Sequence, residues 1–547
     1  MCQDEGPESG QAAPGFNWDR DGGKSMKASI SGSPSADAVA ATPGDAAAKK
    51  QIRGSSLLLL GRTVSLAVNF VVQIVIIRYL SKADYGAFAY ALSLVSLGAS
   101  IATFGLDRSI TRFVPIYDEH GNYGKLFGTL ALAVGTVTSI GLVSVAVVYG
   151  LVATVGGGSL LGSERAVSVL VVLVLLAPIQ ALDGLLMGMF AVFSKPRAIF
   201  FRKYVLAPSL RLIIILLLVL GHQGVIFLAA GYVVSGALGV ALYVVMLERT
   251  LRSEGLFARF SAGAMEIPAR EVFSFTIPLL TSDLVYMAMN TSDVILLGHF
   301  GGAVDVAAFR VVSPVALLNQ LVMSSFTMLF TPLAARMFAR GDKEGVNRLY
   351  WQTAIWIAVL SFPIFSLTFS LAKPVTETLF GARYAESATY LALLSLAYYF
   401  NAALGFNGLT LKVFGRLRYI VSINTVAALV NIGLNLVLIP RYGPLGAAIG
   451  TSSTLIVHNL LKQGGLLLGT GVRLFERKDW LVYASIVLAA GLLLAVQIIL
   501  SPPAYIGFAL ASLASLTVVA LSRRSLRAGE TFPELMRFRI MRLVAGT

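Results

Sequence analysis

Apolar runs long enough to cross a lipid bilayer recur from residue 56 almost to the end of the chain, and they constrain its fold more than any other feature. In a helix, about 20 apolar residues span the hydrocarbon core. The runs predict fourteen helices, over 56–80, 85–107, 126–150, 166–190, 199–221, 225–247, 272–298, 306–334, 352–371, 386–408, 418–439, 444–467, 479–500 and 503–521. The predicted fold class is an all-α polytopic membrane protein.

The composition fits a chain that meets lipid over most of its surface. Hydrophobic residues make up 56% of the sequence and charged residues only 13%, unlike a soluble globular domain. Residues 1–52 are rich in Gly, Ala, Ser and Pro and predict a disordered cytoplasmic tail. In this tail Met26 is a candidate true start, and Cys2 is the single cysteine, so no disulfide can form within the chain.

The positive residues behind the net charge of +15 lie mostly on one side of the predicted membrane. With a cytoplasmic amino terminus, tails and even-numbered loops hold 33 of the 43 Lys and Arg residues, including Lys195, Arg197, Arg202 and Lys203. The opposite side holds six: Arg78, Lys82, Arg165, Lys373, Arg383 and Arg441. This bias predicts a protein of the cytoplasmic (inner) membrane with both termini in the cytoplasm. The expected partners of the basic excess are anionic membrane lipids, and no nucleic-acid partner is predicted.

The chain contains an internal duplication with a shift of about 221 residues. Residues 78–97 match 299–318 and 192–199 match 413–420, while 118–127 with 341–350 and 224–231 with 443–450 deviate from this shift by two residues. Four matches in one order predict two parallel six-helix bundles around a central cavity, followed by two further helices. The predicted division is a tail (1–52), an N-lobe (53–250), a cytoplasmic linker (251–271), a C-lobe (272–468), two appended helices (469–522) and a basic tail (523–547).

Several predicted helices carry a polar face inside the membrane. In the first helix Arg62, Asn69 and Gln73 are seven and four residues apart, so an α-helix places them on one side. The eighth helix repeats the pattern with Arg310 and Gln320. An arginine at the centre of a membrane helix costs about 2.5–3.5 kcal/mol on insertion scales, so it is expected to face water, a counter-charge or an anionic ligand. These faces predict that the central cavity is aqueous.

The candidate cavity residues share charge or hydrogen-bonding capacity. They are Arg62, Asn69, Gln73, Arg211, Asp283, Asn290, Arg310 and Gln320. Three carboxylates, Asp183, Asp283 and Asp293, are candidates for binding Na⁺ or H⁺. For each residue a structural role is the alternative, since an arginine can cap buried carbonyls or pair with a carboxylate. Arg211 can also lie at the lipid interface if its helix begins later than predicted.

The sequence carries no constellation that indicates catalysis. It contains no G-x-x-x-x-G-K-[ST] phosphate loop, and its four histidines are scattered without metal-ligand spacing. We therefore expect a protein that is not an enzyme and that holds no metal or organic cofactor.

Three stretches resemble one known family. The segment "IIRYLSKADYGAFAYALS" after the first helix, the basic loop between the second and third helices, and "NIGLNLVLIPRYGPLGAAIGT" at 431–451 are similar to the Wzx-type polysaccharide and oligosaccharide flippases. These belong to the MOP superfamily, which also contains the MATE drug exporters and the lipid II flippase MurJ. The resemblance covers residues 50–470.

The resemblance implies movement of an undecaprenyl- or other polyprenyl-diphosphate-linked glycan from the cytoplasmic to the outer leaflet by alternating access. Arg62 and Arg310 would then bind the diphosphate, because guanidinium groups pair with phosphate oxygens. The glycan polymerase and the glycosyltransferases of the same pathway are expected partners.

Three alternatives stay open at this stage. They are an ion-coupled MATE-type exporter of small amphiphilic molecules, a lipid II flippase, and a non-transporting scaffold for glycan-assembly enzymes. A cation exporter should have an acidic cavity, and a scaffold has no need of polar faces inside the membrane. The two appended helices are a feature shared with the lipid II flippase, so the exact subfamily stays open.

The shift of 221 residues also makes Arg62 and Asp283 equivalent positions of the two repeats. Opposite charges at equivalent positions of the first and seventh helices lead to the hypothesis that the two side chains attract one another across the empty cavity. An arriving diphosphate would compete for Arg62 and release the lobes. The alternative is that each residue is satisfied within its own lobe. A double-mutant cycle on lobe opening tests the hypothesis, which additive effects would contradict.

Overall fold

The computed structural model describes residues 43–155, 164–193, 196–259, 265–472 and 479–526, and within these ranges every regular element is a helix. Contacts divide the chain into two units, Met1–Ile52 and Arg53–Thr547. Of the first unit only Pro43–Ile52 is described, as the start of α1. The all-α fold class predicted from the apolar runs is confirmed, whereas the lobe boundaries stay predictions.

The N-lobe is built from the following helices, several of which are interrupted by a bend or a change of helix type. They are α1 (Pro43–Tyr79), α2 (Lys82–Thr103), α3 (Leu106–Glu119), α4 (Tyr123–Val155), α6 (Glu164–Leu173), α7 (Leu176–Val192), α8 (Pro196–Ile199), the π-helix η1 (Phe200–Leu206), α9 (Ala207–Leu220) and α10 (Val225–Ser253), with the 3-10 turn η2 (Phe257–Arg259) after it. α2 and α3 form one apolar stretch that bends at Phe104 and Gly105, whose φ angles of 51° and 68° are left-handed. The second helix was predicted to end at residue 107, but the helical chain continues to Glu119.

The helices of the C-lobe and those after it are likewise interrupted in several places. They are α11 (Ala269–Phe300), α12 (Ala303–Arg310), α13 (Ser313–Leu317), η4 (Leu318–Gln320), α14 (Leu321–Ala339), α15 (Lys343–Phe365), η5 (Ser366–Ser370), α16 (Ala372–Phe380), η6 (Ala382–Tyr384), α17 (Ser387–Ala403), α18 (Asn407–Val413), α19 (Leu417–Thr470), α20 (Trp480–Ile499) and α21 (Ala504–Leu526). The single helix predicted over 306–334 is broken after Arg310. Pro314 explains the break, because its ring clashes with the carbonyl four residues earlier and offers no N–H.

Twelve helical stretches of the described residues are long and apolar enough to cross a membrane. One of them, α19, has 54 residues, and a straight helix of that length would measure about 80 Å, far more than a bilayer. At Gly443 the backbone leaves the helical region, with φ 54° and ψ −131°, between Pro440 and Pro444. The 32-residue helix α11 is not among the twelve. The count of fourteen stays a prediction.

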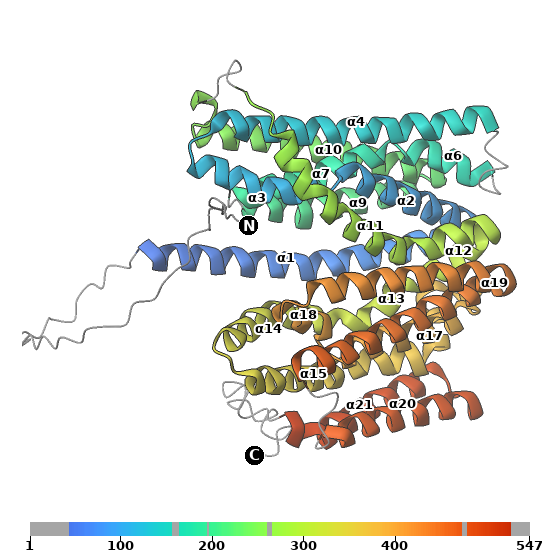
Figure 1. The fold of residues 1–547 in the computed structure, drawn as a ribbon. Helices are drawn as coiled ribbons and strands as arrows, with labels where there is room; N and C mark the ends of the chain where they lie inside the picture. The colour runs from blue at the N-terminus through green and yellow to red at the C-terminus, as the bar shows by residue number, and fades with distance from the viewer. Residues whose placement is uncertain (1–42, 156–163, 194–195, 260–264, 473–478, 527–547) are drawn as a thin grey trace, which may run out of the picture. The chain divides into compact units, whose positions relative to one another are not determined.

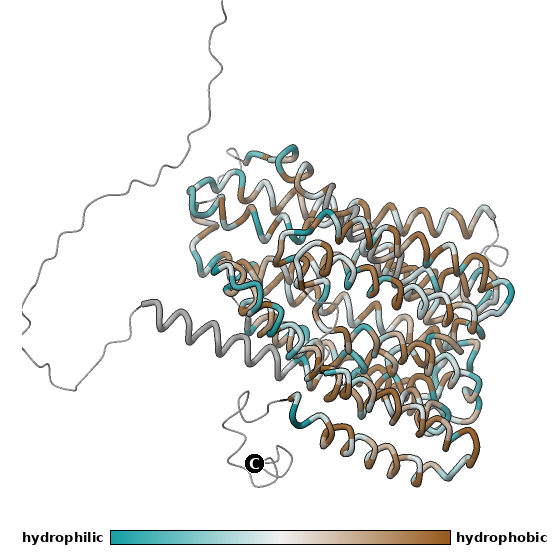
Figure 2. The backbone as a smooth tube through the Cα atoms, turned by 60° about the horizontal axis from the view of Figure 1, so that its bottom comes forward, coloured by the Kyte–Doolittle hydropathy of each residue, from teal (hydrophilic) through white to brown (hydrophobic). Residues whose placement is uncertain are grey.

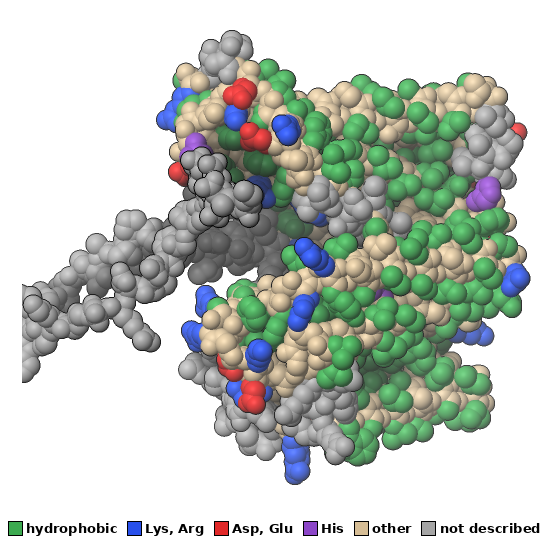
Figure 3. Space-filling view, in the orientation of Figure 1, with side chains coloured by type: hydrophobic (Ala, Val, Ile, Leu, Met, Phe, Trp, Pro, Cys, Tyr) green, Lys and Arg blue, Asp and Glu red, His purple; other side chains and the backbone are tan. Residues whose placement is uncertain are grey.

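The helices of residues 53–526 form two groups (Figure 1). One group holds α2, α3, α4, α6, α7, α9 and α10; the other holds α13 to α15 and α17 to α19, with α20 and α21 beside it, and α1 lies between the groups. α11 and α12 run from the first group to the second, touching α2 and α19. Hydrophilic residues concentrate near the helix ends (Figure 2), and hydrophobic side chains cover much of the flank between them (Figure 3). This distribution fits a multi-pass membrane protein.

The two groups are tied together where α1 ends and α2 begins, a region called the Arg78 end below. Arg78 donates hydrogen bonds to the carbonyls of Thr378 and Leu379, and Lys82 forms a 2.8 Å ion pair with Glu386. Close to this end, α2 packs so tightly on α12 that a Cβ atom on Gly86 would lie 1.7 Å from the carbonyl oxygen of Ala303. Both lobes therefore meet directly at this end.

At the opposite end, α11 is tied to the N-lobe. Glu271, in the first turn of α11, accepts hydrogen bonds from Tyr117 (2.7 Å) and Lys125 (3.1 Å). One turn further, the hydroxyl groups of Ser109 and Thr276 are 2.5 Å apart. α11 thus contacts α3 with its beginning and the C-lobe helix α19 with later turns.

Candidate substrate cavity

A cavity of about 910 Å³ lies mainly within the N-lobe. Its walls come from α1, α2, α7, η1, α9 and α10, and the C-lobe contributes only Thr291 and Arg310 to the described lining. Along α1 the lining extends from Arg62 to Ile76, a rise of about 21 Å at 1.5 Å per residue. The cavity is therefore long enough to reach across much of a bilayer core.

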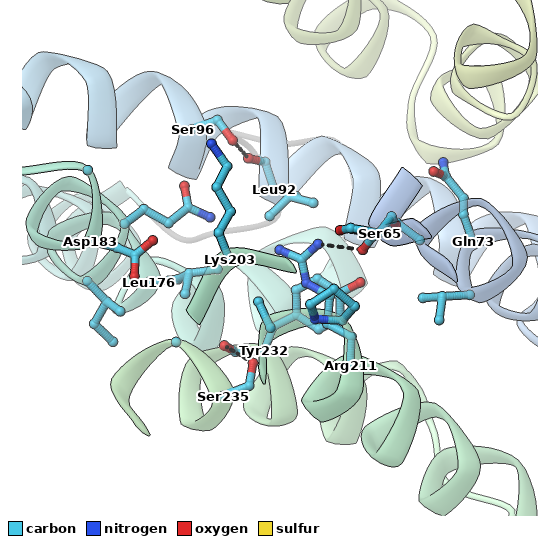
Figure 4. A pocket seen from close by; sticks show the side chains of 18 of the residues that line it. Ser65, Gln73, Leu92, Ser96, Leu176, Asp183, Lys203, Arg211, Tyr232 and Ser235 are labelled. Atoms are coloured by element: carbon cyan, nitrogen blue, oxygen red, sulfur yellow. Dashed lines mark hydrogen bonds between the residues drawn. The ribbon is translucent and has the colours of Figure 1, made fainter. Parts of the chain in front are cut away.

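The charges of the lining are mostly positive. Arg62, Arg202, Lys203, Arg211 and Arg310 face a single carboxylate, Asp183, among the described lining residues. In Figure 4, Lys203 and Arg211 extend toward the helices that carry Ser96 and Ser65, α2 and α1. A water-filled space with this excess of cations attracts anions, and low-dielectric walls strengthen the attraction.

The polar face predicted on the first helix lines this cavity. Asn69 donates to the carbonyl of Ser65 (2.7 Å) and accepts from Arg211 Nη1 (3.0 Å). Gln73 donates to the hydroxyl of Tyr85 at 3.3 Å. Arg211 also lies over the ring of Tyr232, 5.5 Å from its centre. Arg211 is therefore held by two helices and belongs to the cavity wall.

Arg62 and Arg310 lie in the lining without an ion pair among the described side chains. Arg310 is the last residue of α12, directly before the break in that helix. Asp293 is near enough to attract Arg310 electrostatically without forming an ion pair with it. Neither guanidinium is ion-paired with a described carboxylate, so both can bind an anion that enters the cavity.

Two lining cations were assigned from the sequence to a cytoplasmic loop, and this assignment is corrected. Arg202 and Lys203 lie in η1, where Arg202 is only 6% exposed and its Nη2 lies 2.8 Å from Asp183 Oδ1. On a regular α-helix Arg202 and Arg211, nine residues apart, would point in directions about 180° apart. The wider turn of the π-helix changes this phase, so an α-helical pattern could not have grouped them.

The other candidates are not all in the cavity. Gln320 ends the 3-10 turn η4 and is absent from the described lining, because the breaks after Arg310 change the helical phase between the two residues. The side chains of Asp283 and Asn290 lie outside the part of α11 whose side chains are described. The attraction between Arg62 and Asp283 therefore stays a prediction.

Asp293 occupies a separate polar cluster between α11 and α19. It is 5% exposed, and its two carboxylate oxygens accept hydrogen bonds from Asn435 (3.0 Å) and Thr451 (2.8 Å). Nearby, Asn431 accepts from Ser292 at 2.9 Å. No Lys or Arg is ion-paired with Asp293 among the described residues. A buried carboxylate with neutral oxygen-bearing neighbours is a suitable place for a small cation or a proton.

Helices long and apolar enough to cross a membrane, in two groups, with a charged cavity lined mainly by the N-lobe, define a multi-pass membrane transporter. Residues 52–338 match the family model described as "Polysaccharide biosynthesis protein", more than half of the chain, so this protein belongs to that family. Residues 278–437 also match the MatE model.

Three similar proteins cover most of the sequence. The chain is 23% identical over 415 residues to an uncharacterized membrane protein of Methanocaldococcus jannaschii, covering 74% of this chain and 81% of that protein. It is 25% identical over 361 residues to the succinoglycan biosynthesis transport protein ExoT of Rhizobium meliloti, covering 64% and 66%. The structure of the lipid II flippase MurJ in an inward closed conformation has a TM-score of 0.67 and 16% identity, covering 86% of this chain and 99% of that one. This last likeness concerns the fold alone.

Proposed function

We propose that this protein moves a polyprenyl-diphosphate-linked oligosaccharide from the cytoplasmic to the outer leaflet of the cell membrane by alternating access, for cell-surface polysaccharide biosynthesis. The observation that carries the proposal is the charge of the cavity, in which five cations face one carboxylate among the described lining residues. A diphosphate is anionic, and its oxygen pairs match the paired N–H groups of a guanidinium. The activity is transport, in which no covalent bond is made or broken.

The names of similar proteins support the two parts of this cargo. The family is described by polysaccharide biosynthesis, and the Rhizobium relative by transport in succinoglycan biosynthesis. The structural neighbour is named for flipping lipid II. A glycan carried on a lipid combines both descriptions, and lipid II itself is the alternative cargo.

The lobe contacts support alternating access. With both termini in the cytoplasm, as the charge bias predicts, the Arg78 end is the outer end. Direct contact between the lobes at that end agrees with a conformation that is closed to the outside, whereas at the opposite end the described side-chain hydrogen bonds to the N-lobe come from the beginning of α11. A small-cation exporter is disfavoured, since the cavity cations would repel its cargo.

The test is flipping in proteoliposomes that contain the purified protein and a fluorescently labelled polyprenyl-diphosphate oligosaccharide. We expect Arg62→Gln and Arg310→Gln each to slow flipping about tenfold or more, since hydrogen bonds to charged groups contribute about 1.5–3 kcal/mol. The control is Arg336→Gln, an exposed arginine in the last turn of α14 and outside the described lining. Export of a cationic dye by the wild type, without flipping of the diphosphate lipid, would support the MATE-type alternative instead.

Ion coupling at Asp293 is a second proposal, and a separate observation favours it. The carboxylate is buried among neutral donors, with no ion pair in the described part of the chain. A buried unpaired carboxylate is costly, whereas Na⁺ or a proton would neutralise it. We infer that Asp293 takes up one of these cations during the transport cycle.

A further inference from the structure

An ion pair between a buried arginine and a half-exposed carboxylate lies in the cavity wall far from the Arg78 end. Arg202 Nη2 is 2.8 Å from Asp183 Oδ1, and the Arg202 guanidinium lies over the ring of Tyr243, 5.6 Å from its centre. The distal end of α9 lies beside the Arg78 end, because Tyr79 donates a hydrogen bond to the carbonyl of Gln223. Arg202 is 18 residues before the last residue of α9, so the pair is separated from that end by most of the membrane-crossing length.

The surrounding helices are shaped to hold this guanidinium. A Cβ atom on Gly239 of α10 would lie 2.0 Å from Arg202 Nη2, so only glycine leaves room for the guanidinium there. The π-helix η1 orients Arg202 toward this space and places Lys203 beside it in the lining. The guanidinium therefore packs between Asp183 of α7 and Gly239 of α10.

The pair leaves the hydrogen-bonding capacity of Arg202 incompletely used. Arg202 Nε is buried and has no hydrogen-bond partner among the described residues. The side chain of Asp183 is 36% exposed, against 8% for that of Arg202. The carboxylate is therefore the more exposed partner and can move into the cavity.

We propose that Arg202 is a further phosphate-binding residue of the cavity and that Asp183 is its resident counter-ion, which the cargo diphosphate displaces. The inference rests on the proposed function, because it assumes an anionic cargo. A phosphate group can accept from Nε and Nη2 together, whereas Asp183 is close to Nη2, and the adjacent Lys203 adds attraction. When the cavity is empty, Asp183 neutralises a buried arginine that would otherwise be costly. Competition from Asp183 also keeps cargo binding weak enough for release.

The experiment measures the affinity of the purified full-length protein for geranylgeranyl diphosphate, a short-chain polyprenyl diphosphate, by titration calorimetry. Asp183→Asn removes the competitor and should tighten binding about tenfold, whereas Arg202→Gln should weaken it about tenfold. In the double variant Asp183→Asn should give no gain, because its effect acts through Arg202. The double variant carries neither buried charge, so it avoids an uncompensated ion. Glu248→Gln, which removes a carboxylate from an exposed pair with Arg252 on α10, is the matched control and should change nothing.

Thermal unfolding of each variant accompanies the titrations. A folded Asp183→Asn protein with unchanged or weaker affinity overturns the inference and makes the pair structural only. If Arg62→Gln weakens binding while the Arg202 and Asp183 variants leave the affinity unchanged, the proposed function stands and this inference fails. If the wild type does not bind the diphosphate, both fail. Inorganic pyrophosphate should compete with the probe; stronger competition by phosphatidylglycerol would identify a bilayer headgroup as the ligand and overturn the assignment to cargo.

Discussion

Arg78 and Arg383 each donate hydrogen bonds to backbone carbonyls of the segment that carries the other. Arg78, at the end of α1, bonds the carbonyls of Thr378 and Leu379 in the last turn of α16. Arg383, just after α16, bonds the carbonyls of Ile77, Arg78 and Leu80 around the end of α1. Cations at helix C-termini are stabilised by the carbonyls that lack partners there. These reciprocal hydrogen bonds join the two lobes at this end.

Removing these reciprocal hydrogen bonds should favour opening of the Arg78 end. We expect Arg78→Ala and Arg383→Ala each to raise the open-to-closed ratio about fivefold, which corresponds to about 1 kcal/mol. Spin labels at Asp84 and Glu377, in a Cys2→Ser background, report the separation by electron paramagnetic resonance. The control is Lys373→Ala, which removes an exposed lysine of the same short helix α16. Unchanged distances in both arginine variants would mean that other contacts hold the end closed.

Gly86 should tolerate no side chain. In Gly86→Ala the new methyl group meets a backbone carbonyl, that of Ala303, so α2 and α12 must separate. We expect a fall of several degrees in the unfolding temperature, measured by intrinsic fluorescence, because overpacking costs about 1–3 kcal/mol. Gly135→Ala in α4, where nothing lies within 4 Å, should leave stability unchanged or slightly higher. Equal effects of the two substitutions would contradict the close approach.

Asn69 should act through Arg211. Asn69→Ala removes the acceptor 3.0 Å from Arg211 Nη1 and lets the guanidinium move, so flipping should slow by up to about tenfold. Asn69→Asp should slow it further, because a carboxylate would neutralise the arginine. The flipping assay measures both, and Thr425→Ala, a partly exposed side chain of α19 outside the described lining, is the control. A normal rate in Asn69→Asp would argue against an anionic cargo near Arg211.

Membrane potential alone should accelerate outward flipping. Moving one charge through the potential contributes about 2.3 kcal/mol per 100 mV, so a diphosphate with about two negative charges gains about 4–5 kcal/mol when the inside is negative. Proteoliposomes with a valinomycin-imposed potassium gradient provide the measurement. Transport that ignores the potential and requires a Na⁺ or H⁺ gradient would show that net charge movement is not the driving force.

Asp293 should matter for the transport cycle and not for cargo binding. Asp293→Asn keeps the shape of the cluster with Asn435 and Thr451 but removes the charge that a cation would neutralise. We expect the affinity for geranylgeranyl diphosphate to stay unchanged, while any dependence of flipping on Na⁺ or pH is lost. Ser422→Ala, an exposed side chain on α19, serves as the control. Retention of the ion dependence in Asp293→Asn would exclude this carboxylate as the ion site.

The helical membrane fold follows from the sequence alone, since apolar runs of spanning length leave the backbone no other way to satisfy its polar groups. The sequence also identified Arg62, Asn69 and Gln73 as one face, because all three lie on the same uninterrupted α-helix and its period is fixed. Within such a helix, spacing alone decides which side chains lie together.

Some other residues of the cavity lining could be identified only from the three-dimensional fold. Arg202 enters the cavity because a π-helix changes the phase of its segment and Gly239 of another helix makes room for its guanidinium. Gln320 leaves the described lining because the helix breaks after Arg310. Asp293 accepts hydrogen bonds from Asn435 and Thr451, which lie more than 140 residues later in the sequence. Helix breaks and contacts between distant segments depend on packing, which the period of a single helix does not encode.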